Sequence, residues 1–136
     1  MNRLFILFSA LAFTSVFVGC GRDYESDLSK IIKVDLKDSL QQYDKIVLIP
    51  GSGCTGCISN AEDYFFKNVG NNNILFILTN NFSEKGLKLR LGADNLSKAN
   101  VIVDEKNTFY LRNYKENIYP VLIDITNGRI VKIQTF

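Results

Sequence analysis

Two cysteines separated by two residues are the clearest candidates for chemistry in this chain of 136 residues. Cys54 and Cys57 follow an apolar run directly and stand at the start of a segment with helical spacing. Such a pair can cycle between a dithiol and a disulfide, because the positive end of a helix stabilises a thiolate. The sequence therefore predicts that Cys54 is the attacking nucleophile and that Cys57 resolves the mixed disulfide.

A structural disulfide and a zinc site are the alternatives for these cysteines. Exported domains commonly carry structural disulfides, but a loop of two intervening residues restricts the unfolded chain little and so adds little stability. A tetrahedral zinc ion needs four ligands, and the chain has no histidine and only one other cysteine, Cys20. We therefore expect no metal and no bound cofactor. The absence of histidine also excludes histidine-based acid–base catalysis.

Apolar runs predict the sheet that must position the cysteines. The segments Lys45 to Pro50 and Asn73 to Thr79 are rich in consecutive apolar residues, which is typical of buried central strands. The residues between the cysteines and Gly70 have apolar positions at helical spacing, so strand, cysteines, helix and strand are contiguous. This order predicts a parallel β-α-β unit. The helical positions are Ile58, Ala61, Phe65 and Val69.

The remaining apolar runs predict four more strands and a short helix. Ser83 is expected to cap a helix that reaches about Leu91, and Asn127-Gly128 is the strongest hairpin signal in the chain. The expected fold is therefore α/β, with a sheet that is parallel inside, antiparallel at one edge and flanked by helices. The further strands cover Ile31–Leu36 (an edge strand), Asn100–Asp104, Val121–Ile125 and Arg129–Ile133.

The N-terminal segment has the layout of an export signal. It begins with Met1-Asn2-Arg3, followed by an uncharged apolar stretch from Leu4 to Val18. As a helix this stretch rises about 22 Å, short of the roughly 30 Å hydrocarbon core of a bilayer. The sequence Phe17-Val18-Gly19-Cys20 resembles the lipobox of bacterial lipoproteins, although Phe17 stands where leucine is usual. The resemblance implies cleavage before Cys20 and lipidation of Cys20.

The chain is thereby divided into three parts. Residues 1–19 are expected to be a lipoprotein signal peptide, residues 20–30 the lipidated cysteine and a polar tether, and residues 31–136 one domain. An uncleaved anchor and an ordinary secretory signal are the alternatives, and all three place the domain outside the cytoplasm. Without Arg3, fifteen basic residues remain against fourteen acidic ones, which gives no reason to expect a nucleic-acid partner.

From Ile31 to Phe136 the chain resembles the thioredoxin superfamily, and within it the membrane-tethered TlpA-like thiol-disulfide oxidoreductases. The resemblance rests on the strand at Ile46 to Ile49, on the cysteine pair, and on Tyr119-Pro120 before a strand. It implies that Pro120 is a cis-proline beside the dithiol and that the backbone of Tyr119 pairs with bound substrate. The alternative for Pro120 is a trans-proline at the start of an edge strand.

The chain departs from this family at four places. Gly53 stands where thioredoxins have tryptophan, Leu48 replaces a buried acid, and Asn60 replaces a glutamate of TlpA-like proteins, with Glu62 two residues on. No closing helix is expected after the last strand. One apolar sheet face is then left to a homodimer, a partner or the segment Leu36 to Tyr43.

Three functions are compatible with these features. The leading one is a lipid-anchored thiol-disulfide oxidoreductase of the bacterial cell envelope, facing the periplasm or cell exterior. It would exchange electrons with exported protein thiols or disulfides and with a membrane electron donor or acceptor, and would contact the bilayer through Cys20. The second is a redox-inactive binding module on the same fold. The third is a peroxiredoxin-like peroxidase, suggested by Pro50 before the pair, although Cys54 occupies the place of the threonine that orients peroxide.

Overall fold

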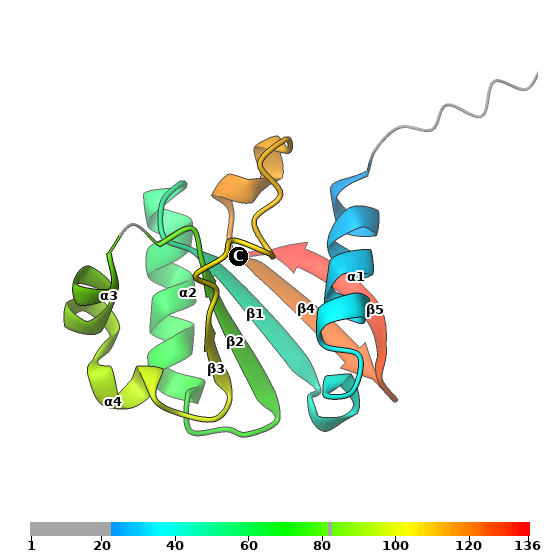
Figure 1. The fold of residues 1–136 in the computed structure, drawn as a ribbon, viewed down its shortest axis with the longest axis horizontal. Helices are drawn as coiled ribbons and strands as arrows, with labels where there is room; N and C mark the ends of the chain where they lie inside the picture. Colours follow the sequence, from blue (N-terminus) through cyan, green and yellow to red (C-terminus); the bar gives the residue numbers. More distant parts are fainter. Residues whose placement is uncertain (1–22, 82) are drawn as a thin grey trace, which may run out of the picture.

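A five-stranded mixed sheet organises the computed structural model, which describes residues 23–81 and 83–136 (Figure 1). The strand order is β3-β2-β1-β4-β5, with β1 parallel to β2 and β2 parallel to β3, while β4 is antiparallel to both β1 and β5. This is a thioredoxin-like fold, as the sequence predicts. The strands are β1 (Lys45–Pro50), β2 (Ile74–Thr79), β3 (Val101–Val103), β4 (Val121–Thr126) and β5 (Arg129–Thr135). The helices are α1 (Tyr24–Asp35), α2 (Thr55–Asn68), α3 (Glu84–Leu91) and α4 (Ala93–Leu96), with short 3₁₀ turns η1 (Leu40–Gln42) and η2 (Lys115–Ile118).

The two central strands are buried on both faces. All six residues of β2 and the last five of β1 are buried, because neighbouring side chains of a strand point to opposite faces and both faces are covered. Helices α2 and α3 cover one face, where Phe65 packs against Phe76 with ring centroids 5.0 Å apart. The predicted strands from Lys45 onwards, the helix after the cysteines and the helix capped by Ser83 are confirmed.

Helix α1 corrects the prediction for residues 24–36. A strand was expected over Ile31–Leu36 after an unstructured tether, but residues 31–35 belong to a helix that begins at Tyr24 and is capped by Asp23, and Leu36 is its C-cap. The helix buries Tyr24, Leu28 and Ile32. These residues are four apart, close to the helical period of about 3.6 residues, and the pattern begins inside the segment assigned to the tether. The alternation over residues 31–36 is therefore only part of a longer helical pattern.

The second sheet face is covered by α1 and the residues that follow it. The face expected to be bare presents Ile46, Leu48 and Ile123, which form one apolar cluster with the buried side of α1. Leu36 and Leu40 extend this cover. Cover by the segment Leu36 to Tyr43 was one of the predicted alternatives, and part of that segment does cover the face. Figure 1 shows α1 and α2 on opposite sides of the sheet.

The C-terminal hairpin is formed as predicted. Asn127 and Gly128 have φ angles of 52° and 70°, and two successive residues with positive φ match the turn that joins twisted antiparallel strands. The hairpin places β5 at one edge of the sheet and leaves β4 beside β1, with Leu48 opposite Val121.

The predicted signal peptide, the lipobox and Cys20 lie outside the described residues. In the part of the chain that the structure describes, no helix is both long enough and apolar enough to cross a membrane. The division of the chain at residues 19 and 20 stays a prediction.

Packing of α1 on the sheet predicts a difference between two truncations on that helix. Leu28 is 0% exposed and Val34 is 76% exposed. We expect Leu28→Ala to lower the free energy of unfolding by about 3 kcal/mol, because it leaves a cavity in the core, and Val34→Ala to change it by less than about 0.5 kcal/mol. Urea unfolding of the chain lacking residues 1–20 measures both. Equal effects would contradict the packing of α1.

Candidate functional site

The predicted cysteine pair is a disulfide at the start of α2. Cys54 and Cys57 are bonded, with their Cα atoms 5.3 Å apart, and both residues are half-buried. Cys54 is the N-cap residue of α2, and its carbonyl accepts the first helical hydrogen bond from Ile58 at 2.9 Å. The structure therefore brings the two predicted site cysteines together at the end of the central strand.

The first turn of α2 favours a negative charge on a reduced cysteine. It contains no acidic residue, and no side chain caps it, so the unpaired amide groups of the turn point towards the region of the sulfurs. These amides and the helix dipole stabilise a thiolate at the N-terminus. This environment suits a nucleophilic or leaving sulfur at Cys54.

A backbone contact joins the cysteine loop to η2. The amide of Cys54 donates a hydrogen bond of 2.9 Å to the carbonyl oxygen of Ile118. A Cβ atom at Gly53 would overlap that carbonyl and lie 2.7 Å from the Ile118 Cα, and the φ angle of Gly53 is +147°. Glycine is the residue that tolerates both conditions. The glycine in the place of the thioredoxin tryptophan is thus explained by the close approach of Ile118.

Ile118 is a site residue that the sequence reasoning missed. Its backbone binds the cysteine loop, and its side chain is 42% exposed beside it. The only signal in the sequence was its position two residues before Pro120. An apolar residue in such a connection has no periodicity to mark it, so its role depends on the tertiary contact with Cys54.

The predicted cis-proline is wrong. None of the described residues forms a cis peptide bond, so the bond between Tyr119 and Pro120 is trans. Tyr119 is extended, with φ −103° and ψ 137°, which is the conformation favoured before a proline. The 3₁₀ turn η2 already directs the chain into β4, and a trans bond completes that path.

Tyr119 and Pro120 nevertheless lie close to the cysteine loop, because they directly follow Ile118, which contacts Cys54. Pro120 is buried directly before β4, and Tyr119 is 38% exposed next to Ile118. The amide of Tyr119 donates to the carbonyl of Glu116 at 3.0 Å, so this amide is engaged within η2. A role of Tyr119 and Pro120 in positioning substrate stays a prediction.

Neither position 48 nor Glu62 brings a carboxylate to the disulfide. Leu48, at the place of the buried acid, is 4% exposed within the apolar cluster under α1. Glu62 lies 2.7 Å from Arg90 Nε through its Oε1, which is buried and receives no hydrogen bond. This ion pair ties α2 to α3. Among residues 23–81 and 83–136, no group of three or more histidine, cysteine, aspartate or glutamate side chains could hold a metal ion.

Asparagines hold the loop that leads from β1 to the cysteines. The amide side chain of Asn80 donates to Ser52 Oγ at 3.0 Å, and its backbone amide donates to Asn107 Oδ1 at 2.9 Å. A Cβ atom at Gly51 would lie 2.8 Å from Asn81 Oδ1. These contacts fix the path of the loop before Cys54.

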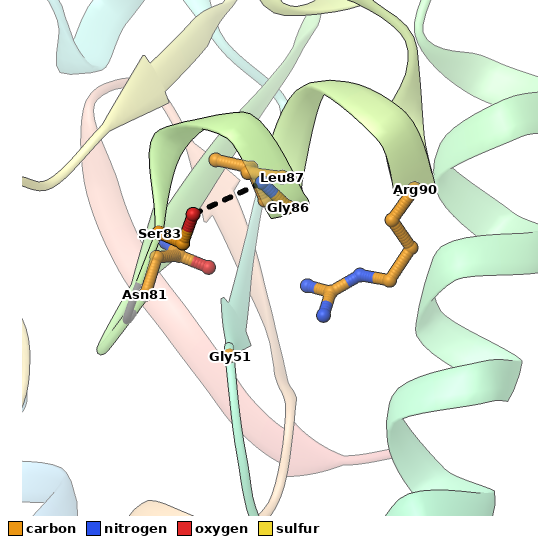
Figure 2. A pocket seen from close by; sticks show the side chains of 6 residues that line it. All are labelled: Gly51, Asn81, Ser83, Gly86, Leu87 and Arg90. Carbon is orange, nitrogen blue, oxygen red and sulfur yellow. Dashed lines mark hydrogen bonds between the residues drawn. The ribbon is translucent and has the colours of Figure 1, made fainter.

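A hollow of about 200 Å³ lies beside this loop (Figure 2). The guanidinium group of Arg90 points into it, and Ser83 Oγ accepts a hydrogen bond of 3.2 Å from Gly86 N at the start of α3. Neither cysteine lines the hollow, so it is separate from the disulfide. Its lining residues are Gly51, Asn81, Ser83, Gly86, Leu87 and Arg90.

No protein-family model matches the chain, and no curated protein or solved structure matches it. A thioredoxin-like mixed sheet carries a Cys-x-x-Cys disulfide at the N-terminus of the helix that follows its central strand. This combination is compatible with a member of the thioredoxin superfamily.

The contact between Gly53 and Ile118 predicts different tolerances for two neighbouring glycines. A Cβ atom at Gly56 has nothing within 4 Å. We expect Gly53→Ala to lower the free energy of unfolding of the oxidised protein by about 1–3 kcal/mol through strain and displacement of Ile118. Gly56→Ala should leave it unchanged or raise it by up to about 1 kcal/mol, because it lies inside a helix. Urea unfolding without reductant measures both, and a tolerated Gly53→Ala would contradict the close approach.

Proposed function

We propose that the protein is a thiol-disulfide oxidoreductase of the bacterial cell envelope, anchored by a lipid on Cys20 and acting on exported protein thiols or disulfides. The observation that supports it most is the half-buried Cys54–Cys57 disulfide at the N-terminus of α2. A disulfide that closes only two intervening residues stabilises a fold little. Its place at a helix start suits exchange chemistry better than structural bracing.

The exchange proceeds in two balanced steps. A substrate thiolate attacks Cys54 Sγ, so a mixed disulfide forms while the Cys54–Cys57 bond breaks and Cys57 leaves as a thiolate. A second substrate thiolate then attacks the substrate sulfur of the mixed disulfide and releases Cys54. Two electrons pass from the two substrate thiolates to the cysteine pair, and the thiolates formed at Cys54 and Cys57 take up as many protons as the substrate thiols released on ionisation. The reverse sequence reduces a substrate disulfide. A membrane partner then restores the starting state: its disulfide accepts the electrons after the pair has oxidised a substrate, and its dithiol donates them after the pair has reduced one.

The surroundings of Cys54 suit the approach of a polypeptide. Gly53, Thr55 and Gly56 are exposed and small or short-branched, and Ile118 and Tyr119 present exposed apolar surface next to them. An extended substrate segment can therefore bring its backbone close to Cys54 while its side chains contact this apolar surface. Cys57 lies within the first turn of α2, which makes it the resolving thiol.

A redox-inactive binding module is the second candidate, and Leu48 favours it. The apolar surroundings of Leu48 contain no proton acceptor at the place where thioredoxins bury an acid. Under the leading proposal, water accepts the proton of Cys57. Under the second, the same surface holds a partner without electron transfer, and binding survives substitution of both cysteines by serine.

The oxidoreductase proposal predicts a reversible two-electron couple for the pair. We expect a reduction potential between about −270 and −120 mV, the range spanned by thioredoxin and DsbA. Equilibration of the chain lacking residues 1–20 with glutathione or dithiothreitol buffers measures it. A value near the lower limit indicates a reductant and one near the upper limit a disulfide donor. The lack of any reversible couple would leave the binding module.

The assigned order of attack predicts unequal trapping by two single-cysteine variants. With glutathione disulfide, Cys57→Ser should accumulate a stable mixed disulfide on Cys54, because no resolving thiol remains. The matched variant Cys54→Ser should be modified at least about ten-fold more slowly, because Cys57 lies deeper in the helix. Intact-mass measurement over time follows both. Equal rates would show that the two roles are assigned wrongly.

A further inference from the structure

The chain between the proposed anchor and the folded domain is very short. Three peptide units separate Cys20 from Asp23, and they span at most about 11 Å when extended. Asp23 already caps α1, whose first residue, Tyr24, is buried in the core. A lipid on Cys20 would therefore hold the first turn of α1 close to the headgroups, without the longer spacer expected from residues 20–30.

The first turn of α1 lies at the same end of the sheet as the disulfide. The ring of Tyr24 packs edge-on against Tyr114, with centroids 5.6 Å apart. Burial raises the pKa of Tyr24 to about 12, and the nearby charge of Glu116 acts in the same direction. Glu116 belongs to η2, whose last residue, Ile118, accepts the hydrogen bond from Cys54. A continuous set of contacts thus connects the start of α1 with the cysteine loop.

The opposite end of the domain is remote from both the start of α1 and the disulfide. Helix α1 has twelve residues, so it carries the chain about 18 Å away from its start. Past its C-terminal end, Gln41 meets the hairpin turn, where a Cβ atom at Gly128 would lie 2.8 Å from Gln41 Cγ. Asn72 lies in the turn between α2 and β2. The six-residue strand β2 runs from this turn towards the disulfide end, so Asn72 lies at the opposite end of the sheet. Figure 1 shows the starts of α1 and α2 and the η2 turn at one end, away from the α2–β2 turn.

We propose that the Cys54–Cys57 pair faces the membrane surface and exchanges with a membrane-embedded protein that presents a thiol or disulfide at headgroup level. This inference rests on the lipid anchor of the proposed function. The short tether sets the orientation, because it binds the disulfide end of the domain to the bilayer. Exposed Ile118 and Tyr119 suit that depth, since tyrosine places an apolar ring and a polar hydroxyl at the interface.

Charge favours a protein over lipid as the partner at this end. Among the described residues of the first turn of α1, of η2 and of residues 110–114 before it, the exposed acids are Asp23, Glu25 and Glu116, and the exposed cations are Arg112 and Lys115. Such a surface has no excess of positive charge to attract anionic headgroups. The lipid therefore positions the domain, while the reacting group belongs to a protein held in the same membrane.

A lipid-linked disulfide tests the orientation with the full, lipidated chain. The reduced protein is reconstituted in phosphatidylcholine vesicles containing a phosphatidylethanolamine that bears a pyridyl disulfide on its headgroup. Cys54 attacks this disulfide and releases pyridine-2-thione, and Cys57 then forms the Cys54–Cys57 bond and releases the lipid thiol. One pyridine-2-thione appears per dithiol oxidised. Each rate is divided by the rate of the same protein with soluble 2,2′-dithiodipyridine, which corrects for intrinsic reactivity.

Two comparisons give the expected result. Cys57→Ser, which keeps only Cys54 in the domain, should have a normalised rate at least about ten-fold above that of Asn72→Cys carried with Cys54→Ser and Cys57→Ser. Insertion of thirty glycine and serine residues between Gly21 and Arg22 should reduce the difference to less than about three-fold, because a long tether lets either end reach the lipid.

Each contrary outcome identifies what has failed. Equal normalised rates for the two thiols with the native tether would overturn the membrane-facing orientation, while a normal reaction of the wild-type dithiol with the soluble disulfide would leave the oxidoreductase proposal standing. Failure of the soluble reaction would overturn the proposed function itself. An intact mass that shows no lipid on Cys20 would overturn the anchor and this inference with it.

Discussion

Burial of β1 on both faces is the constraint on which the rest of the structure depends. Its side chains alternate between the cluster under α1 and the cluster under α2, so the strand is stable only if each face is covered. Helix α2 covers one face and begins at Thr55, after a short loop that follows the end of β1 at Pro50, so Cys54 and Cys57 lie beyond the carboxyl end of the strand. The need to cover the other face is met by α1. The position of the cysteine pair and the need for α1 to cover the second face therefore both follow from the burial of β1.

The departures from thioredoxins form a consistent local arrangement. Gly53 allows the backbone of Ile118 to approach, and this approach satisfies the amide of Cys54 with a carbonyl oxygen. A bulky residue at Gly53 would separate the two segments. Leu48 keeps the layer beneath the site apolar, which stabilises the core but removes an internal proton acceptor. The proposed exchange would then depend on the helix terminus and on solvent.

The N-terminal helix connects the proposed anchor with the site. Tyr24 and Tyr114 pack together, and the segment after Tyr114 carries the carbonyl that binds Cys54. The element nearest the proposed lipid therefore contacts the segment that supports the disulfide. Because α1 also covers half of the core, its docking cannot be lost without exposing Leu48 and its neighbours. The proposed anchor, the core and the site would therefore be coupled through the same helix.

The sequence by itself determined the features that local patterns encode. Continuous apolar runs identified β1 and β2, the helical spacing from Ile58 to Val69 identified α2, and Asn127-Gly128 identified the hairpin, because these signals depend on burial period and backbone preference. The cysteine spacing likewise identified the disulfide.

Only the tertiary structure decided the features that depend on contacts between distant segments. Ile31 to Leu36 alternate in apolar character, while Tyr24, Leu28 and Ile32 have helical spacing, and the sheet face that α1 covers decided between these two patterns. The trans bond before Pro120 and the role of Ile118 depend on how η2 meets the cysteine loop. The contact between Cys54 and Ile118 joins residues more than sixty positions apart in the sequence, and no local period records it. Such contacts are set by packing, because the backbone groups and apolar faces of one segment are satisfied only by another.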